Sequence, residues 1–305
     1  MVSMVYGNPD DKPLSTHQPG AFLKHWMEAH DYPSDTLVIL DLDDTAITTP
    51  DGQWLGQSAM FYDMLNPLKQ RYPDKRTSEL AHVVDPLLTE VYKRVPVIAT
   101  DPLLPDVLKA LIDRDITVIG MTARGGNMAD VTMMQLSKAG IRFSELDETS
   151  RRIDLDSHRQ FRVEQAGVVF VSQGNSKGET LVQLLNRDFI KRPERVIFID
   201  DRKKHLNSVF ESLTGYPSAI DYLPVYCSYP ETKEKYDSTK ARHQLIRFLK
   251  ESKNIFEVNQ LIKQDPYTRD LLSECRDDHS SSDRHDCVNL LSERTFINDG
   301  QKPHE

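Results

Sequence analysis

The stretch "LVILDLDDTAITT", Leu37–Thr49, decides the predicted fold. Four apolar residues run directly into Asp41, Asp43 and Asp44. Continuous apolar character predicts a strand that is covered on both faces, as in a parallel sheet. Carboxylates this close repel each other unless a cation lies between them. The stretch therefore predicts a buried strand that delivers carboxylates to one open end.

The same pattern recurs along the chain. Apolar runs end at polar or small residues in "ITVIG" before Met121, "GVVFV" before Ser172, "RVIFI" before Asp200 and, more weakly, "IDYLPVYC" at Cys227. Helical patterns lie between these runs, at 106–114, 128–140, 177–188 and 203–215. Alternation of strands and helices predicts an α/β fold with a doubly wound, Rossmann-like, mainly parallel sheet.

The interval 51–98 does not fit the alternation, and we interpret it as a small helical cap inserted after the first strand; a long surface excursion is the alternative. Apolar positions recur at helical spacing over Thr77–Arg94, although Pro86 should kink or split that helix. A shorter helix over Gln57–Leu65 should stop before Pro67. The predicted organisation is a flexible arm at 1–30, a core at 31–50 and 99–263, the cap at 51–98, and a polar, loosely ordered tail at 264–305.

Charge and length limit the possible partners. The 305 residues carry a net charge of −9, and residues 264–305 hold 10 acidic against 5 basic side chains. An acidic protein is a poor ligand for a phosphate backbone, so nucleic acid is disfavoured. No apolar run approaches the roughly 20 residues that span a bilayer, and the start shows no secretory signal. We therefore expect a cytoplasmic protein without a membrane span.

The three cysteines, Cys227, Cys275 and Cys287, make no disulfide framework and fit a reducing cytosol. Cys275 and Cys287 lie near His279 and His285, and these residue types suit zinc. Their spacing matches no zinc pattern that we can justify. We therefore favour an ordinary polar tail over a zinc site.

Reactive side chains gather at the predicted strand ends, where open α/β sheets bind ligands. They are Asp41 and Asp43, Thr122 and Arg124 in "GMTARGG", Lys177 in "SQGNSKGE", and Asp200 with Asp201. No cysteine or histidine accompanies the carboxylates, so a hard ion such as Mg²⁺ is the expected partner. Lys177, at the start of a helix, adds a positive charge and amide donors for a phosphate. A carboxylate at this edge is able to attack phosphorus, and Asp43 lies two residues further on as a proton carrier.

"DLDDT", Thr122 in "GMTAR", Lys177 in "GNSKGE" and "FIDD" resemble, in order and in strand placement, the four motifs of the haloacid dehalogenase superfamily. The resemblance covers about residues 36–227. An aspartate nucleophile with a second aspartate at the +2 position is similar to the superfamily's phosphatases rather than its dehalogenases. With "WLGQ" and "GMTAR", the chain looks most similar to a poorly characterised bacterial family with members in intracellular pathogens, which implies a possible exported effector.

The resemblance implies a role for each motif residue. Asp41 would be the nucleophile, Asp43 the general acid and base, and Thr122 a donor to the phosphoryl oxygens. Lys177 would hold the nucleophile and the phosphate. The implied Mg²⁺ ligands are Asp41, Asp43 through its backbone carbonyl, and Asp200. Asp201 would be either a further ligand or an orienter of Lys177.

Weaker candidates surround these motifs. Arg124 is a candidate ligand of the substrate phosphate, but pairing with a surface carboxylate is the commoner use of such an arginine. Trp54 either stacks on a substrate beside the site or belongs to the cap core. Asp44 should point away from the metal and serve a turn, because successive side chains alternate.

Three residues of the insert, Tyr62, His82 and Tyr92, are interpreted as core or surface rather than as substrate contacts. The expected function is an Mg²⁺-dependent phosphatase that hydrolyses a phosphomonoester through an aspartyl-phosphate. A phosphotransferase or mutase on the same machinery and a non-catalytic binding protein are the alternatives. The substrate is expected to be a phosphorylated small molecule, with a phosphoprotein as the alternative.

Overall fold

A central eight-stranded sheet organises the computed structural model, which describes residues 13–29, 35–146, 151–156, 159–172, 174–279 and 281–292. The strands run in the order β1-β10-β9-β2-β5-β8-β7-β6. Their bounds are β1 Leu14–Thr16, β2 Thr36–Leu40, β5 Thr117–Thr122, β6 Arg151–Asp154, β7 Gln160–Glu164, β8 Val168–Phe170, β9 Arg195–Asp200 and β10 Asp221–Cys227. All pairings from β1 to β8 are parallel, and β7 and β6 extend the sheet as an antiparallel hairpin. The predicted doubly wound, mainly parallel sheet is confirmed.

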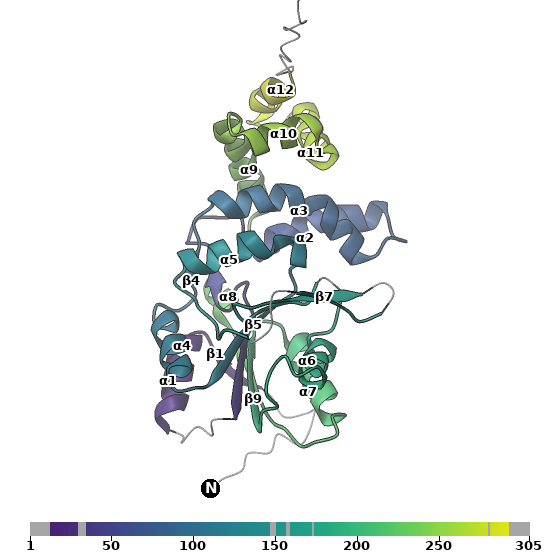
Figure 1. Cartoon of the computed structure of the whole chain (residues 1–305). Coiled ribbons are helices and arrows are strands. Elements are labelled where there is room, and N and C mark those ends of the chain that lie inside the picture. The colour runs from purple at the N-terminus through teal and green to yellow at the C-terminus, as the bar shows by residue number, and fades with distance from the viewer. Residues whose placement is uncertain are drawn as a thin grey trace, which may run out of the picture.

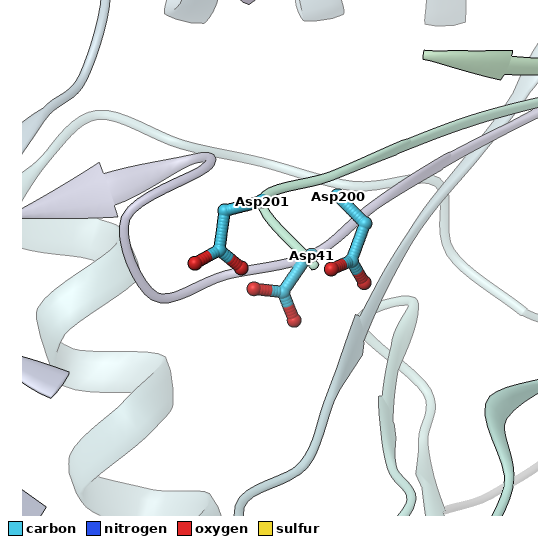
Figure 2. Close-up of side chains that lie close together, drawn as sticks. All are labelled: Asp41, Asp200 and Asp201. Carbon is cyan, nitrogen blue, oxygen red and sulfur yellow. The ribbon is translucent and has the colours of Figure 1, made fainter. Parts of the chain in front are cut away.

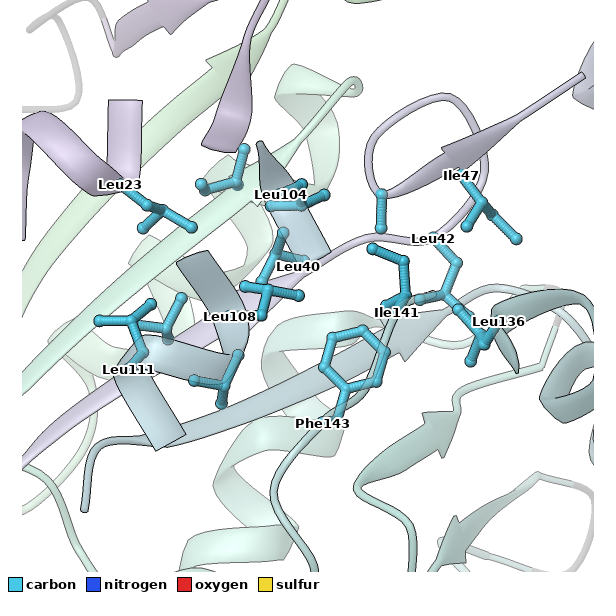
Figure 3. Close-up of a cluster of buried hydrophobic side chains, with 14 of the residues drawn as sticks. Leu23, Leu40, Leu42, Ile47, Leu104, Leu108, Leu111, Leu136, Ile141 and Phe143 are labelled. Carbon is cyan, nitrogen blue, oxygen red and sulfur yellow. The ribbon is translucent and has the colours of Figure 1, made fainter. Parts of the chain in front are cut away.

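Helices cover both faces of the sheet (Figure 1). Helices α1 (Pro19–Ala29) and α4 (Leu104–Ile112) lie on one face, and α6 (Lys177–Asn186) and α7 (Lys203–Thr214) lie on the other. Strand β2 shows why its sequence is continuously apolar. Val38 and Leu40 pack into the cluster around α4 that Figure 3 shows, whereas Leu37 and Ile39 pack into the cluster under α6 and α7. Burying each such side chain stabilises the fold by roughly 1.5–3 kcal/mol.

The residues expected to form a cap contain helices α2 (Ser58–Arg71) and α3 (Thr77–Arg94), which lie over the carboxyl edge of the sheet (Figure 1). Both helices continue through their prolines, so the predicted stop before Pro67 and the predicted split at Pro86 are wrong. Each proline removes one helical hydrogen bond. Because both prolines lie on exposed faces of their helices, water is able to reach the carbonyl oxygens that lose a partner.

The tail is a set of packed helices and not the loosely ordered segment predicted for 264–305, at least over the described residues 264–279 and 281–292. Helices α9 (Ser238–Ser252), α10 (Phe256–Gln264), α11 (Pro266–Asp277) and α12 (Arg284–Ser292) stack beyond α2 and α3 (Figure 1). They share one apolar cluster with α2 and α3, in which Leu272 is fully buried. Polar composition hid these helices because each buries only a narrow apolar stripe.

Cys275 of α11 and Cys287 of α12 form a disulfide, which contradicts the prediction that the cysteines make none. The bond occupies both sulfur atoms, so the pair offers no thiolate to a zinc ion. Disulfides persist in oxidising compartments, and the argument for a reducing cytosol from cysteine usage therefore fails. Cys227 is a buried free thiol.

The predicted N-terminal arm is also partly wrong. Within 1–30, β1 adds to the edge of the sheet beside β10, and α1 packs against α4. Residues 1–12 and 30 lie outside the described residues. Leu23 is fully buried in the core cluster of that face, which explains why the segment folds onto the sheet.

The remaining elements are short β3 (Ile47–Thr48) paired with β4 (Ile98–Ala99), the 3₁₀ turn Gly126–Met128, α5 (Ala129–Lys138) and α8 (Tyr229–Thr232). Within the described ranges, every helix is too short or too polar to cross a membrane.

Candidate active site

Three carboxylates meet at the carboxyl edge of the sheet. Asp41 directly follows β2, Asp200 ends β9, and Asp201 follows it. One oxygen from each carboxylate lies within 4.8 Å of the others, and Figure 2 shows the three side chains converging. The strands β2 and β9 are parallel neighbours, so their ends coincide in space although 159 residues separate Asp41 from Asp200. The predicted convergence of these residues is what the structure shows.

Lys177 enters this cluster from the first residue of α6. The hydroxyl of Ser176 caps that helix by accepting from the Glu179 amide at 3.2 Å. Lys177 is 1% exposed; its Nζ lies 2.7 Å from Asp200 Oδ2 and also donates to Asp41 Oδ1. The next residue, Gly178, lets α6 approach α7 closely, because a Cβ there would lie 2.0 Å from the Ser208 carbonyl oxygen.

Burial and like charge control ionisation in the cluster. Burial raises the pKa of Asp41 to about 7; Lys177 opposes this shift and Asp200 adds to it. Burial raises the pKa of Asp201 to about 8, with further repulsion from Asp41 and Asp200. Burial also disfavours the Asp200 anion, but Lys177 outweighs that effect and holds the pKa of Asp200 below its usual value. Lys177 stays charged because Asp200 and Asp41 raise its pKa against the effect of burial.

This arrangement fits a divalent cation. Three clustered carboxylates face the Lys177 ammonium and, 3.9 Å from Asp201, the Arg202 guanidinium, so one negative charge stays uncompensated when all are ionised. The donor atoms are carboxylate oxygens, which Mg²⁺ prefers. Burial, with repulsion from the neighbouring carboxylates added to it, raises the pKa values of Asp41 and Asp201, and a cation bound between them would favour their ionised forms. Asp41, Asp200 and Asp201 are therefore the residues able to hold such an ion.

His205 belongs to this site, which corrects the statement that no histidine accompanies the carboxylates. It lies on the first turn of α7, and its Nδ1 is 3.1 Å from both carboxylate oxygens of Asp200. Its position four residues after Asp201, at a helix start, was the available sequence signal. The His205 ring contacts the Asp200 carboxylate and orients it. The atoms able to hold a metal ion are still the carboxylate oxygens of Asp41, Asp200 and Asp201.

Asp43 points to a different partner from Asp41. Arg124 grips it with two hydrogen bonds, Nε to Oδ2 at 2.9 Å and Nη2 to Oδ1 at 2.6 Å. Arg124 is buried, and its Nη1 donates to Thr132 Oγ1 at 3.0 Å and to Gln135 Oε1 at 2.7 Å. The ring of Tyr92 lies under the guanidinium, 4.5 Å from it. Arg124 pairs with a carboxylate, as we expected for most such arginines. Its partner is the largely buried Asp43 at the edge of the sheet and not a surface carboxylate.

Asp44 serves the turn that follows β2. Its φ of 60° lies in the left-handed region, which an aspartate tolerates better than most residues. Its carboxylate accepts from Thr48 Oγ1 at 3.0 Å and from the hydroxyl of Ser58, the first residue of α2. It lies outside the three-carboxylate cluster, in agreement with the prediction. Asp44 thus ties the first motif to the helices above it.

A cavity of about 790 Å³ opens from these groups toward α2 and α3. Its lining includes Asp41, Asp43, Thr122, Arg124, Asp201 and His205. Tyr62, His82 and Tyr92 also line it. Tyr92 is buried in the apolar core cluster and His82 is exposed, as the assignment to core or surface predicted, although all three also border the cavity. The apolar patterns of α2 and α3 placed these residues near a boundary but did not show that the boundary faces a cavity.

Trp54 does not face the cavity. It is 4% exposed, and its backbone amide donates to Gln244 Oε1 of α9 at 2.9 Å. The ammonium of Lys240 lies 4.9 Å from its ring centre. This placement contradicts a substrate-stacking role and agrees with the alternative that Trp54 is a core residue.

A comparison of the sequence with known families gives one match. Residues 23–260 match the family described as "Protein of unknown function (DUF2608)". The chain belongs to this family. The match spans all of the motif residues at the carboxyl edge, from Asp41 to Asp201. A search of the curated proteins gives no significant match to this DUF2608 chain.

Several solved structures resemble the DUF2608 chain weakly. A class C acid phosphatase from Bacillus anthracis aligns at 11% identity over 84% of this chain and 85% of that one, with a TM-score of 0.34. The same enzyme with tungstate bound aligns at 13% identity over 74% and 78%, with a TM-score of 0.32. A phospho-aspartyl intermediate analogue of phosphoserine phosphatase aligns at 17% identity over 58% and 82%, with a TM-score of 0.31. Likenesses this low carry no argument about function.

Proposed function

We propose that this chain is an Mg²⁺-dependent phosphatase of the haloacid dehalogenase type that hydrolyses a phosphomonoester of a small molecule. One observation carries the proposal: Asp41 converges with Lys177, Asp200 and Asp201 at the edge of a cavity that Asp41, Asp201, Asp43 and Thr122 line. Phosphoryl transfer requires a nucleophile, a proton carrier, hydrogen-bond donors to the phosphoryl oxygens and a site for a divalent cation. The bound ion supplies positive charge that offsets the carboxylates and the phosphate.

In the first step, an oxygen of Asp41 attacks phosphorus while the bond from phosphorus to the leaving oxygen breaks. Asp43 gives its proton to that oxygen, which departs as an alcohol. In the second step, Asp43 takes a proton from water as the water oxygen attacks phosphorus. The bond from phosphorus to Asp41 then breaks, releasing inorganic phosphate and restoring the free carboxylate. Thr122 and Lys177 hold the phosphoryl oxygens throughout.

Arg124 acts as a positioning residue for Asp43 in this scheme. Its two hydrogen bonds fix the orientation of the Asp43 carboxylate, and the contacts with Thr132, Gln135 and Tyr92 fix Arg124 itself. A carboxyl group held from one side keeps its remaining positions free, to carry the proton that it gives to the leaving oxygen and, once ionised, to accept a proton from water. The pair lies at the cavity wall, where 26% of the Asp43 side chain is exposed.

Hydrolysis of p-nitrophenyl phosphate tests the proposal directly. The wild-type protein with Mg²⁺ is expected to exceed both the same protein in EDTA and Asp41→Asn by at least about 10⁴-fold in kcat, since loss of a nucleophile removes the covalent route. Asp51→Asn, a change at an exposed aspartate of the same segment, serves as the control and should retain activity. Equal rates for wild type, EDTA-treated protein and Asp41→Asn would refute the proposal.

Trapping identifies the nucleophile independently of turnover. Beryllium fluoride with Mg²⁺ is expected to form a phosphate-like adduct on Asp41, observable by ¹⁹F NMR in wild type and absent in Asp41→Asn. An adduct that persists in Asp41→Asn would assign the nucleophile to another residue.

A further inference from the structure

Arginine dominates the positive charge of the cavity. Seven arginines and, among the described residues, no lysine line it. Four of them, Arg151, Arg152, Arg159 and Arg162, belong to the β6–β7 hairpin, which extends beneath α2 and α3 (Figure 1). The planar guanidinium matches phosphate and carboxylate groups better than an ammonium does. A cavity of about 790 Å³ also has room for much more than one phosphoryl group.

Most of these arginines already have protein partners, but Arg152 has none within the part of the chain that the structure describes. Arg159 binds Asp156 and Glu179, with Nη1 2.6 Å from Glu179 Oε2. Arg152 is exposed and makes no ion pair or hydrogen bond with any described side chain. Asp154 occupies the same face of β6, but it does not pair with Arg152 and does not line the cavity. Arg152 therefore presents an uncompensated positive charge to the cavity.

The register of the hairpin makes this placement unfavourable for the protein alone. Arg152 lies directly opposite Arg162 in the antiparallel β6–β7 pairing, so both side chains share one face. Like charges directly opposite each other on a sheet repel and destabilise the pair. Glu164 binds Arg162 through Nε and relieves part of the repulsion. An anion bound between the two guanidinium groups would relieve the rest.

The same hairpin is seated against the loop that follows Thr122. The stem of Arg162 lies so close to Gly126 that a Cβ on this glycine would lie 2.9 Å from Arg162 Cβ and Cδ. Arg162 Nη1 also donates to the Gly126 carbonyl oxygen at 3.4 Å. These contacts fix the distance between the arginine face of the hairpin and Thr122, the proposed phosphate-binding residue. Two subsites that bind one ligand need such a fixed distance.

From these observations we infer that the hairpin β6–β7 binds a second anionic group of the substrate, a phosphate or a carboxylate, with Arg152 as its main contact and Arg162 beside it. The inference rests on the proposed function, which places the reacting phosphate at Asp41. The substrate class is therefore a phosphomonoester that carries another negative group, and not a phosphate on a neutral body.

Matched substrate pairs test the inference. Fructose 1,6-bisphosphate against fructose 6-phosphate adds a second phosphate, and 3-phosphoglycerate against glycerol 3-phosphate adds a carboxylate. In wild type, kcat/KM should favour the more anionic member of at least one pair by about tenfold, the value of one charge-assisted contact at a half-exposed site. Arg152→Gln should remove most of that preference, and 0.5 M salt should weaken it by screening.

Arg247→Gln is the matched control, because Arg247 is 77% exposed on α9 and does not line the cavity. It should leave the preference ratio unchanged. Binding without turnover gives a second readout: Asp41→Asn should bind the preferred bis-anionic compound more tightly than its partner by calorimetry, and Asp41→Asn/Arg152→Gln should lose that difference.

The outcomes separate the two proposals. Hydrolysis of p-nitrophenyl phosphate without any preference for a second anion overturns this inference and leaves the phosphatase proposal intact. A preference that Arg152→Gln leaves unchanged also overturns it. Absence of Mg²⁺-dependent p-nitrophenyl phosphate hydrolysis overturns the phosphatase proposal itself. Which substrate pair responds identifies the second group as phosphate or carboxylate.

Discussion

The carboxyl edge of the sheet and the C-terminal helices α9–α12 hold their charges in opposite ways. At the edge, buried carboxylates crowd around Lys177, and the pKa of Asp41 is raised to about 7. In the C-terminal helices, ion pairs such as Arg247–Glu251 lie on the surface, while apolar residues and the Cys275–Cys287 disulfide fill the interior. The crowded charges at the edge destabilise the fold but provide reactive groups, whereas the C-terminal helices stabilise the segment above the cavity.

Among changes that keep the nucleophile Asp41, the largest expected effect follows from breaking the buried contacts of Lys177 with Asp41 and Asp200. Lys177→Met should lower kcat by about 10²–10³-fold, because it removes a cation from the phosphoryl site. It should also destabilise the protein by roughly 3–5 kcal/mol at pH 8, since Asp41 and Asp200 would be left as unpaired buried charges. Activity assays and urea denaturation measure the two effects. Lys109→Met, at a 71% exposed lysine of α4, should show neither.

The next effect concerns Asp43 and Arg124. Arg124→Lys keeps the positive charge but loses the two hydrogen bonds that orient the Asp43 carboxylate. Because Asp43 would then be misplaced as a proton donor, kcat should fall by about 10²-fold. Phenyl phosphate should suffer more than p-nitrophenyl phosphate, because its poorer leaving group depends more on protonation. Asp43→Asn should show the same ordering. Equal losses for both substrates would point to a structural role for Arg124.

The disulfide gives the contrasting result in the other region. Cys275→Ser/Cys287→Ser should lower the free energy of unfolding by about 3 kcal/mol, because 12 residues separate the cysteines and the unfolded chain loses a loop constraint. Activity should stay within about twofold, since neither cysteine lines the cavity. Alkylation of the denatured wild type should label one thiol, on Cys227, before reduction and three after it. Three labelled thiols before reduction would disprove the bond.

A further effect at the edge of the sheet is a shift of thermal stability with pH in EDTA. The native pKa values of Asp41 and Asp201, about 7 and about 8, lie above the value of 3.8 in the unfolded chain. Between these limits the native state binds more protons, so stability falls as pH rises from about 4 to 8. Tm should therefore be lower at pH 8 than at pH 5, by a smaller margin in Asp41→Asn. Mg²⁺ should raise Tm at pH 8 more than at pH 5, and an equal rise at both would contradict a carboxylate metal site.

Local sequence was enough to predict the sheet and the four strand ends. The runs before Asp41, Met121, Ser172 and Asp200 are apolar without interruption because neighbours cover both faces of each strand. Parallel strands bring their carboxyl ends to one edge, so a cluster of carboxylates, a threonine and a lysine followed from topology alone.

Only the tertiary structure decided the contacts between distant segments. Arg124 binds Asp43, which lies 81 residues earlier in the chain. His205, on the first turn of α7, contacts Asp200 at the end of β9. Helices continue through Pro67 and Pro86 because water and packing offset a lost hydrogen bond. The physical reason is the same in each case. Strand formation depends on apolar character that each segment carries itself, whereas side-chain partners depend on which segments the whole fold brings together.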